Sequence, residues 1–337
     1  MKLKRKLLAL ILGVSVMGAA SAQAETRDYL LSTAGTGGSF YPVGVGIATL
    51  VKLKLGTRPE NSINLSAITS QGSYDNVNIL SDERADLGVI QSLMTDFGYY
   101  GTGDFEGTPK KSLRAVTALM FNTKQFIALK ELAPTGTMDD LLAYKGKKVV
   151  LGARNSGGLL SFQMFMRKIG VEDPEQFVDQ SYMGFRQRAE ALINGNLDGI
   201  NLTSGVPNSS ATLAMASMEG EVTMLSFTPE MRAKVTDGTV WGPYTIPANT
   251  YPGQPDPIET VAQPNLLVAG AHVPDDVIYE ITKVMYENLP FLKSVHGSLK
   301  DMNIETALKG ITVPLHPGAV KYYREVGIEI PAKLIAE

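Results

Sequence analysis

A strand, a glycine-containing turn and a helix start follow one another in both halves of this chain. In the first half the apolar residues 29–34 lead into the glycine turn 35–38, and residues 45–50 then show a helical spacing of apolar side chains. In the second half residues 147–152 lead into the turn 156–158 and another apolar helical face. Strands that alternate with helices are typical of parallel sheets covered by helices, so the pattern predicts an α/β fold.

The length of the chain predicts two lobes. After removal of an N-terminal segment, 313 residues exceed what one hydrophobic core usually serves. The chain is expected to cross between the lobes near residues 120–130 and 255–270, and residues 241–257, rich in Pro, Gly and Tyr, to form an irregular loop. The expected division is a signal peptide at 1–24, a first lobe made of 25–122 and 262–337, and a second lobe made of 123–261.

The first 24 residues have the layout of an export signal. Four cations between Lys2 and Lys6 precede 14 largely apolar residues, 7–20, and small residues at Ala22 and Ala24 form an A-x-A cleavage pattern. The alternative is a membrane anchor, which the short run disfavours because a bilayer span needs roughly 20 residues. The segment therefore predicts cleavage after Ala24 and a periplasmic location, which the absence of cysteine also allows.

The composition disfavours several classes of function. Removal of the segment leaves 27 Lys and Arg against 34 Asp and Glu, a net charge of about −7, which argues against nucleic-acid binding. The three histidines, His272, His296 and His316, have no metal-ligand spacing, and no G-x-S-x-G or S-x-x-K motif occurs. We therefore expect no catalytic residues, no metal and no cofactor, although triads assembled from distant positions would escape such a search.

Three polar turns are candidate ligand loops, because each precedes a helix start where backbone N–H groups favour an anion. They are residues 35–39, 69–73 and 154–158. None has the spacing of a Walker loop or of a dinucleotide fingerprint, and each alone could be a plain tight turn. Turns from two lobes that meet at the carboxyl ends of strands would hold a carboxylate with neutral donors.

Two arginines and one glutamine are further candidates. Arg154 lies in the third turn and Arg186 at a helix start, and arginine suits paired hydrogen bonding to a carboxylate. Either could instead be an ordinary surface arginine. Gln91 follows the strand 87–90 and is either a ligand-facing amide or only a helix entry.

Six sequence blocks, in order, resemble the TAXI class of solute-binding proteins, which serve tripartite ATP-independent periplasmic (TRAP) transporters. Single blocks are modestly specific, whereas the ordered set is highly specific. The blocks are GTGGSFYPVG (35–44), TSQGS (69–73) with Asn76, ADLGVIQ (85–91), NGNLDG (194–199), IPANTY (246–251) and PLHPGA (314–319).

The resemblance implies a type II periplasmic-binding-protein fold, in which two α/β lobes joined by two crossing strands close on a solute. It also implies a ligand such as glutamate, glutamine or a related dicarboxylate such as 2-oxoglutarate, and we expect a small anionic metabolite here. It further implies delivery to an ion-driven TRAP membrane permease and a protein that is usually monomeric. We expect His316 to form a structural turn or a permease-docking element, the alternative being a ligand contact. The ligand residues implied here are Gly38, Ser39, Tyr41, Ser70, Ser73, Gln91, Asn155 and Ser156.

The third turn departs from the family pattern. Many relatives read G-x-P-G-S-G where this chain has Arg154 and Asn155 in place of Pro-Gly. The additional cation favours a ligand with a second carboxylate, hence a five-carbon dicarboxylate such as 2-oxoglutarate, 2-hydroxyglutarate or glutamate. Two other functions stay open: a sensor that docks on a receptor, and a secreted enzyme on the same scaffold.

Overall fold

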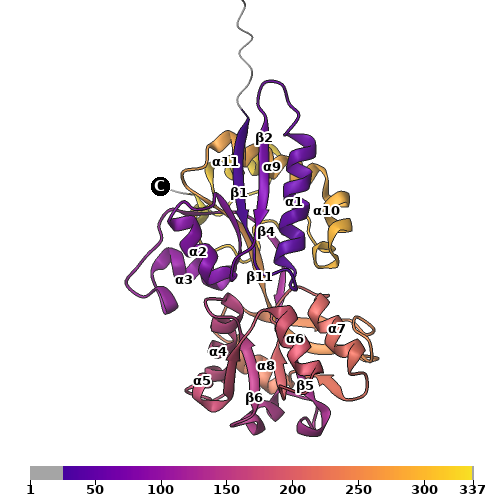
Figure 1. Ribbon diagram of the computed structural model, residues 1–337. Helices are drawn as coiled ribbons and strands as arrows, with labels where there is room; N and C mark the ends of the chain where they lie inside the picture. Colours follow the sequence, from indigo (N-terminus) through magenta and orange to yellow (C-terminus); the bar gives the residue numbers. More distant parts are fainter. Residues whose placement is uncertain (1–25, 336–337) are drawn as a thin grey trace, which may run out of the picture.

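The computed structural model describes residues 26–335, and these form two lobes, each built around its own β-sheet (Figure 1). The predicted signal peptide lies outside the described residues. Within the described part of the chain, no helix is both long and apolar enough to cross a membrane.

The first lobe contains a six-stranded sheet. In spatial order its strands are β2 (Ile63–Ile68), β1 (Arg27–Ser32), β3 (Leu87–Gln91) and β11 (Ile258–Gly270), with β4 (Leu113–Thr123) and β10 (Gly242–Ile246) both paired to β11. The first three strands are parallel, whereas β4, β10 and β3 run antiparallel to β11. The helices of this lobe are α1 (Phe40–Lys54), α2 (Ser73–Ser81), α3 (Ser92–Tyr100), α9 (Asp275–Glu287), α10 (Leu289–Val295) and α11 (Pro317–Glu325).

The second lobe contains a five-stranded sheet. Its strands lie in the order β7 (Asp179–Tyr182), β6 (Lys148–Gly152), β8 (Gly199–Asn201), β5 (Phe126–Leu129) and β9 (Val222–Met224). Its helices are α4 (Gly157–Lys168), α5 (Pro174–Phe177), α6 (Phe185–Ile193), α7 (Ser209–Ser217) and α8 (Pro229–Thr236). Short 3₁₀ turns complete the two lobes at Gly103–Phe105, Lys130–Leu132, Met138–Tyr144, Gly297–Leu299 and Ala332–Leu334. The α/β architecture predicted from the sequence is confirmed.

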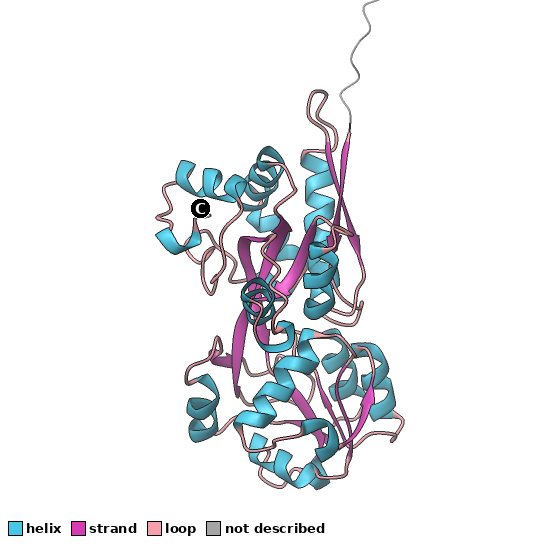
Figure 2. Cartoon of the chain, turned by 90° about the vertical axis from the view of Figure 1, so that its left-hand side faces the viewer, coloured by secondary structure: helices cyan, strands magenta, loops and turns pink. Residues whose placement is uncertain are grey.

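Two long segments connect the lobes, as Figure 2 shows in a side view. β4 of the first sheet ends at Thr123, and β5 of the second sheet begins three residues later at Phe126. The start of β11 accepts a hydrogen bond at Glu259 O from Phe227 N–H of the second lobe, and the same strand continues into the first sheet.

The expectation of an irregular loop over residues 241–257 is partly wrong. Gly242–Ile246 forms β10, whose antiparallel pairing with Ile258–Ala262 outweighs its Gly and Pro content.

The helices cover their sheets with the apolar faces that their sequence periods mark. In α9 the buried face includes Val277, Ile281, Val284 and Met285. In α6 it includes Ala189 and Leu192, which lie in the second of two contiguous hydrophobic clusters. Burial of such faces, at about 25 cal/mol per Å² of apolar area, is the main stabilising contribution to each lobe.

His316 has a structural position at the start of α11. Its ring is buried, Nδ1 accepts a hydrogen bond from Gly318 N–H at 3.2 Å, and Nε2–H donates to the carbonyl oxygen of Val273 at 2.9 Å. One neutral tautomer makes both bonds. Burial is the main reason why the pKa of His316 lies below its ordinary value.

We expect His316→Ala to lower the free energy of unfolding by about 1–3 kcal/mol, because it removes a helix cap and leaves a buried carbonyl without a donor. The unfolded histidine takes up its proton near pH 6.5, above the pKa of the folded state. The contribution of His316 is therefore complete above pH 6.5 and declines as the pH falls below it. Urea unfolding of the unmodified protein and of His316→Ala at pH 7.5 and 5.5 checks this. The difference between their free energies of unfolding should be smaller at pH 5.5. Equal stabilities at pH 7.5 would contradict the structural role.

Candidate ligand-binding cavity

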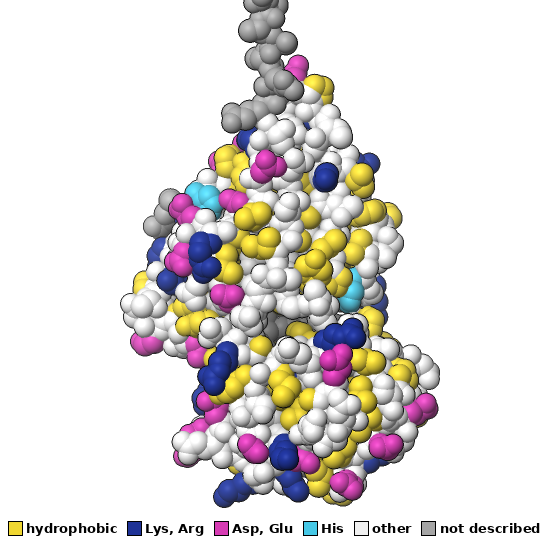
Figure 3. Space-filling model, in the orientation of Figure 1, with side chains coloured by type: hydrophobic (Ala, Val, Ile, Leu, Met, Phe, Trp, Pro, Cys, Tyr) yellow, Lys and Arg dark blue, Asp and Glu magenta, His cyan; other side chains and the backbone are white. Residues whose placement is uncertain are grey.

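A cavity of about 410 Å³ lies between the two lobes. Its lining comes from the loops after β1, β2 and β6 and from the first turns or N-caps of α1, α2, α4 and α6. Ligands in open α/β sheets bind at this end of the strands, and the volume lies within the range of roughly 300–1,000 Å³ of small-molecule sites. Figure 3 shows the junction of the lobes as a narrow hollow, with basic side chains on both sides.

The first glycine turn lies directly against the second lobe. A Cβ on Gly37 would approach Ser210 Oγ to 2.7 Å, and one on Gly38 would approach the Phe185 ring to 2.8 Å. A side chain at either position would therefore separate the start of α1 from the second lobe. This contact gives a packing reason for the two glycines that the sequence places before α1.

Six of the ten residues that the sequence proposed line the cavity. They are Gly38, Ser39, Ser70, Ser73, Gln91 and Ser156. Two of these serines also hold their own turns: the hydroxyl oxygens of Ser70 and Ser156 accept hydrogen bonds from Gly72 and Leu159 N–H. The hydroxyl oxygen of Ser73 accepts from Gln91 N–H and so joins the start of α2 to the end of β3. The same turns place the N–H groups of three helix starts, which have no intrahelical acceptors, at the cavity.

The other four proposed residues do not line the cavity. Tyr41 lies in the first turn of α1 but outside the lining. Arg154 is exposed, and its guanidinium stacks 3.8 Å from the centre of the Tyr182 ring. Arg186 is also exposed and pairs with Glu190 one turn along α6.

Asn155 contributes backbone geometry and a contact between the lobes. Its φ is +57°, in the left-handed region that glycine and asparagine tolerate best. Asparagine thus preserves the conformation that a glycine at this position of the turn would adopt. Its carbonyl oxygen accepts a hydrogen bond from Asp75 N–H of the first lobe at 3.3 Å.

Arg188 is the cation that the structure places at the cavity and that the sequence analysis missed. Its side chain is buried, and it donates from Nε, Nη1 and Nη2 to the carbonyl oxygens of Gly184, Asn201 and Met183. No carboxylate of the described residues pairs with it, and burial lowers its pKa to about 9. Arg188 therefore carries a fixed, buried positive charge at neutral pH, and its guanidinium has two further N–H donors.

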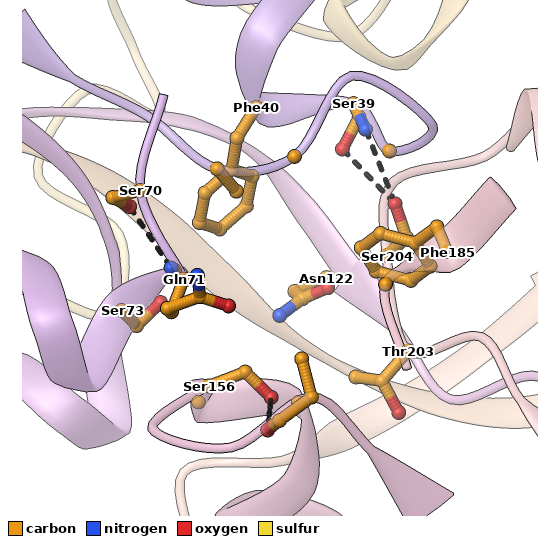
Figure 4. Close-up of a pocket in the computed structure, with 18 of the residues that line it drawn as sticks. Ser39, Phe40, Ser70, Gln71, Ser73, Asn122, Ser156, Phe185, Thr203 and Ser204 are labelled. Atoms are coloured by element: carbon orange, nitrogen blue, oxygen red, sulfur yellow. Dashed lines mark hydrogen bonds between the residues drawn. The ribbon is translucent and has the colours of Figure 1, made fainter. Parts of the chain in front are cut away.

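Asn122, on β4, is the second residue that the sequence analysis missed. It is 2% exposed and lines the cavity, and neither polar atom of its side chain has a hydrogen-bond partner among the described residues. Figure 4 shows its amide pointing into the centre of the cavity. Because a buried amide without partners costs about 1–3 kcal/mol, this geometry indicates a ligand that supplies them.

A hydrogen-bond chain fixes the direction of the Gln91 amide. Gln263 Oε1 accepts from Leu93 N–H at 3.0 Å, so the Gln263 NH₂ group is the one that donates to Gln91 Oε1 at 3.3 Å. The NH₂ group of Gln91 is therefore left as a donor. Together with Arg188 and the helix starts, it makes the cavity rich in donors.

The lobes touch on both sides of the cavity, so the structure is a closed form. On one side Ser39 N–H donates to Ser204 Oγ at 3.3 Å and Gly205 N–H donates to Ser39 Oγ at 3.0 Å, near the labelled pair Ser39 and Ser204 in Figure 4. On the other side Gly157 lies so close to Ser73 that a Cβ added to Gly157 would approach the Cβ of Ser73 to 2.7 Å.

Within residues 26–335 no group of three metal-ligating His, Cys, Asp or Glu side chains occurs.

Two solved structures of low sequence identity share this architecture. The periplasmic binding protein BugD superposes with a TM-score of 0.53 at 12% identity, covering 90% of this chain and 98% of BugD. MatC from Rhodopseudomonas palustris, solved with bound malate, gives a TM-score of 0.52 at 16% identity, covering 81% of this chain and 88% of MatC. At these identities the likeness establishes the fold, that of a periplasmic binding protein. Residues 31–327 match the model of the NMT1-like family, and the chain belongs to that family.

Proposed function

We propose that this chain is the periplasmic solute-binding subunit of a TAXI-type TRAP transporter. It captures a small carboxylate between its lobes and delivers it, without chemical change, to an ion-gradient-driven membrane permease. The observation that carries the proposal is the donor-rich cavity between the lobes, with Arg188 and the unpartnered Asn122 in its lining. The six ordered sequence blocks support the transporter subtype, and the export pattern at 1–24 supports the periplasmic location.

The proposed ligand class is a five-carbon dicarboxylate. One carboxylate would lie on the second-lobe side, near Arg188 and the start of α6. The other would lie on the first-lobe side, near the starts of α1 and α2 and the amide of Gln91. This arrangement gives each carboxylate its own set of donors. The sequence analysis chose a dicarboxylate because of the cation Arg154, whereas the choice now rests on the cation Arg188.

A thermal-shift screen of residues 25–337 tests the proposal. The panel consists of C4 to C6 dicarboxylates, amino acids and their amides, after unfolding and refolding to remove any co-purified solute. A ligand that binds only the folded protein adds about 2.7 kcal/mol to the free energy of unfolding at a hundredfold excess over Kd. We expect a clear rise in Tm with a five-carbon dicarboxylate. A rise only with neutral amino acids would contradict the ligand class, and no rise with any compound would contradict carboxylate capture.

A further inference from the structure

The charges that face the cavity are of one sign. Arg188 lies in its lining, and the positive ends of α1, α2, α4 and α6 open onto it. None of the described residues that line the cavity is Asp or Glu. An ammonium group bound here would meet the Arg188 guanidinium and helix N-termini without a carboxylate to pair with.

Carbonyl oxygens could in principle replace a carboxylate as acceptors for an ammonium group. Several carbonyl oxygens of this cavity already accept a hydrogen bond from the protein. The carbonyl oxygen of Ala153 accepts from the Ser156 hydroxyl at 2.8 Å, and that of Gly35 accepts from Gly38 N–H at 3.4 Å. Other lining carbonyls that already serve as acceptors belong to Gly158, Gly184 and Asn201.

Each buried polar side chain of the lining except that of Asn122 makes at least one hydrogen bond within the protein, whereas Thr36, Thr69 and Gln71 line the cavity but are exposed. Asn201 Oδ1 accepts from the backbone N–H and the hydroxyl of Thr203 at 3.0 and 2.7 Å. Asn122 is the exception, because both its Oδ1 and its Nδ2 have no partner among the described residues. Its amide can donate to an oxo oxygen, or donate to and accept from a hydroxyl group.

We propose that the cavity selects carboxylates that carry an oxo or hydroxy group beside the carboxylate and rejects the corresponding amino acids, with Asn122 as the residue that contacts this oxygen. The selection rests on the proposed capture function. It adds a distinction within the five-carbon dicarboxylates, since 2-oxoglutarate, 2-hydroxyglutarate and glutamate share one skeleton and differ at the second carbon.

Isothermal titration of the refolded chain with these three compounds at pH 7.5 tests the selection. We expect 2-oxoglutarate or 2-hydroxyglutarate to bind at least 30-fold more tightly than glutamate. Glutamate binding as tightly as either, or more tightly, would overturn the selection and leave the capture function intact. Binding of none of the three would overturn the proposed ligand class and, with it, the selection.

Asn122→Asp tests the residue. The change keeps the shape of the side chain but replaces the NH₂ donor by a second oxygen of a carboxylate, which can pair with an ammonium group. The ratio of the glutamate affinity to the 2-oxoglutarate affinity should rise at least 30-fold. Asn122→Ala should weaken 2-oxoglutarate and 2-hydroxyglutarate about tenfold without improving glutamate, since removing one hydrogen-bonding group typically costs about 1.4 kcal/mol, a factor of ten.

Asn265 offers a matched control. It lies on β11, is fully buried and also has both polar side-chain atoms unpartnered, but it does not line the cavity. Asn265→Ala should therefore leave all three affinities within threefold of their values in the unmodified protein. If Asn122→Asp fails to change the affinity ratio, or if Asn265→Ala changes it equally, Asn122 does not select the ligand.

Discussion

Replacement of Arg188 by alanine should weaken the binding of a five-carbon dicarboxylate at least 100-fold. Arg188 is the one lysine or arginine among the described lining residues, and its buried guanidinium is positioned by three backbone carbonyls. Truncating one partner of a buried, hydrogen-bonded charge pair costs about 2–5 kcal/mol, which corresponds to a factor of roughly 30 to several thousand. Isothermal titration with 2-oxoglutarate measures the loss. Urea unfolding shows that the variant is folded at the temperature of the titration.

Two exposed arginines are matched controls for this change. Arg186 lies two positions earlier on the same helix and pairs with Glu190, and Arg154 stacks on Tyr182. Neither arginine lines the cavity, so Arg186→Ala and Arg154→Ala should leave the affinity within threefold. If Arg154→Ala loses as much affinity as Arg188→Ala, Arg154 also binds the ligand. If Arg188→Ala keeps its affinity, Arg188 does not bind the ligand.

The second large effect is expected from Gly157→Ala, which should weaken binding about 30-fold by preventing closure. The added Cβ would lie 2.7 Å from Ser73 Cβ and 3.0 Å from Gln91 Oε1, both on the opposite lobe. Neighbours this close must shift, and Ser73 Cβ is fixed to the backbone at the start of α2. Because both neighbours lie on the opposite lobe, separation of the lobes would free the methyl group from both, and we therefore expect the unfolding midpoint without ligand to be unchanged or slightly higher.

Small-angle X-ray scattering separates loss of closure from loss of folding. The radius of gyration of the unmodified protein should decrease when 2-oxoglutarate is added, whereas that of Gly157→Ala should stay at the ligand-free value. If the variant compacts as fully and binds as tightly as the unmodified protein, the close approach of Gly157 to the first lobe does not limit closure.

The sequence predicts the elements of this fold well because their apolar periods are long and regular. The buried face of α9 and the turns before α1, α2 and α4 lie where the pattern places them. β10 was missed because its pairing with the following strand, β11, determines it, whereas its own residues resemble a loop. Pairing between residues 242–246 and 258–262 has no trace in local composition.

The arginines show how much of the site the sequence contained. Phe185, Ala189 and Leu192 mark the inner face of α6, and Arg188 lies three residues after the first and four before the last, on the same face. Arg186 lies off that face and is exposed. Helical spacing therefore already distinguished Arg188 from Arg186. Arg186 was favoured instead because it lies at the helix start, where an arginine could face a ligand.

Asn122 had no comparable sequence signal. It lies in a strand that is buried on both faces, where an asparagine reads as an irregularity. Its position at the cavity follows from the pairing of β4 with β11 and from the second lobe that closes over it. Only tertiary structure brings these parts of the chain together.

A crystal structure of the protein with 2-oxoglutarate tests the central claim most directly. We expect one molecule between the lobes, with a carboxylate oxygen within hydrogen-bond distance of the Arg188 guanidinium and the 2-oxo oxygen on the Asn122 amide. A ligand bound elsewhere, or a carboxylate in the cavity that contacts neither residue, would contradict the proposed binding site.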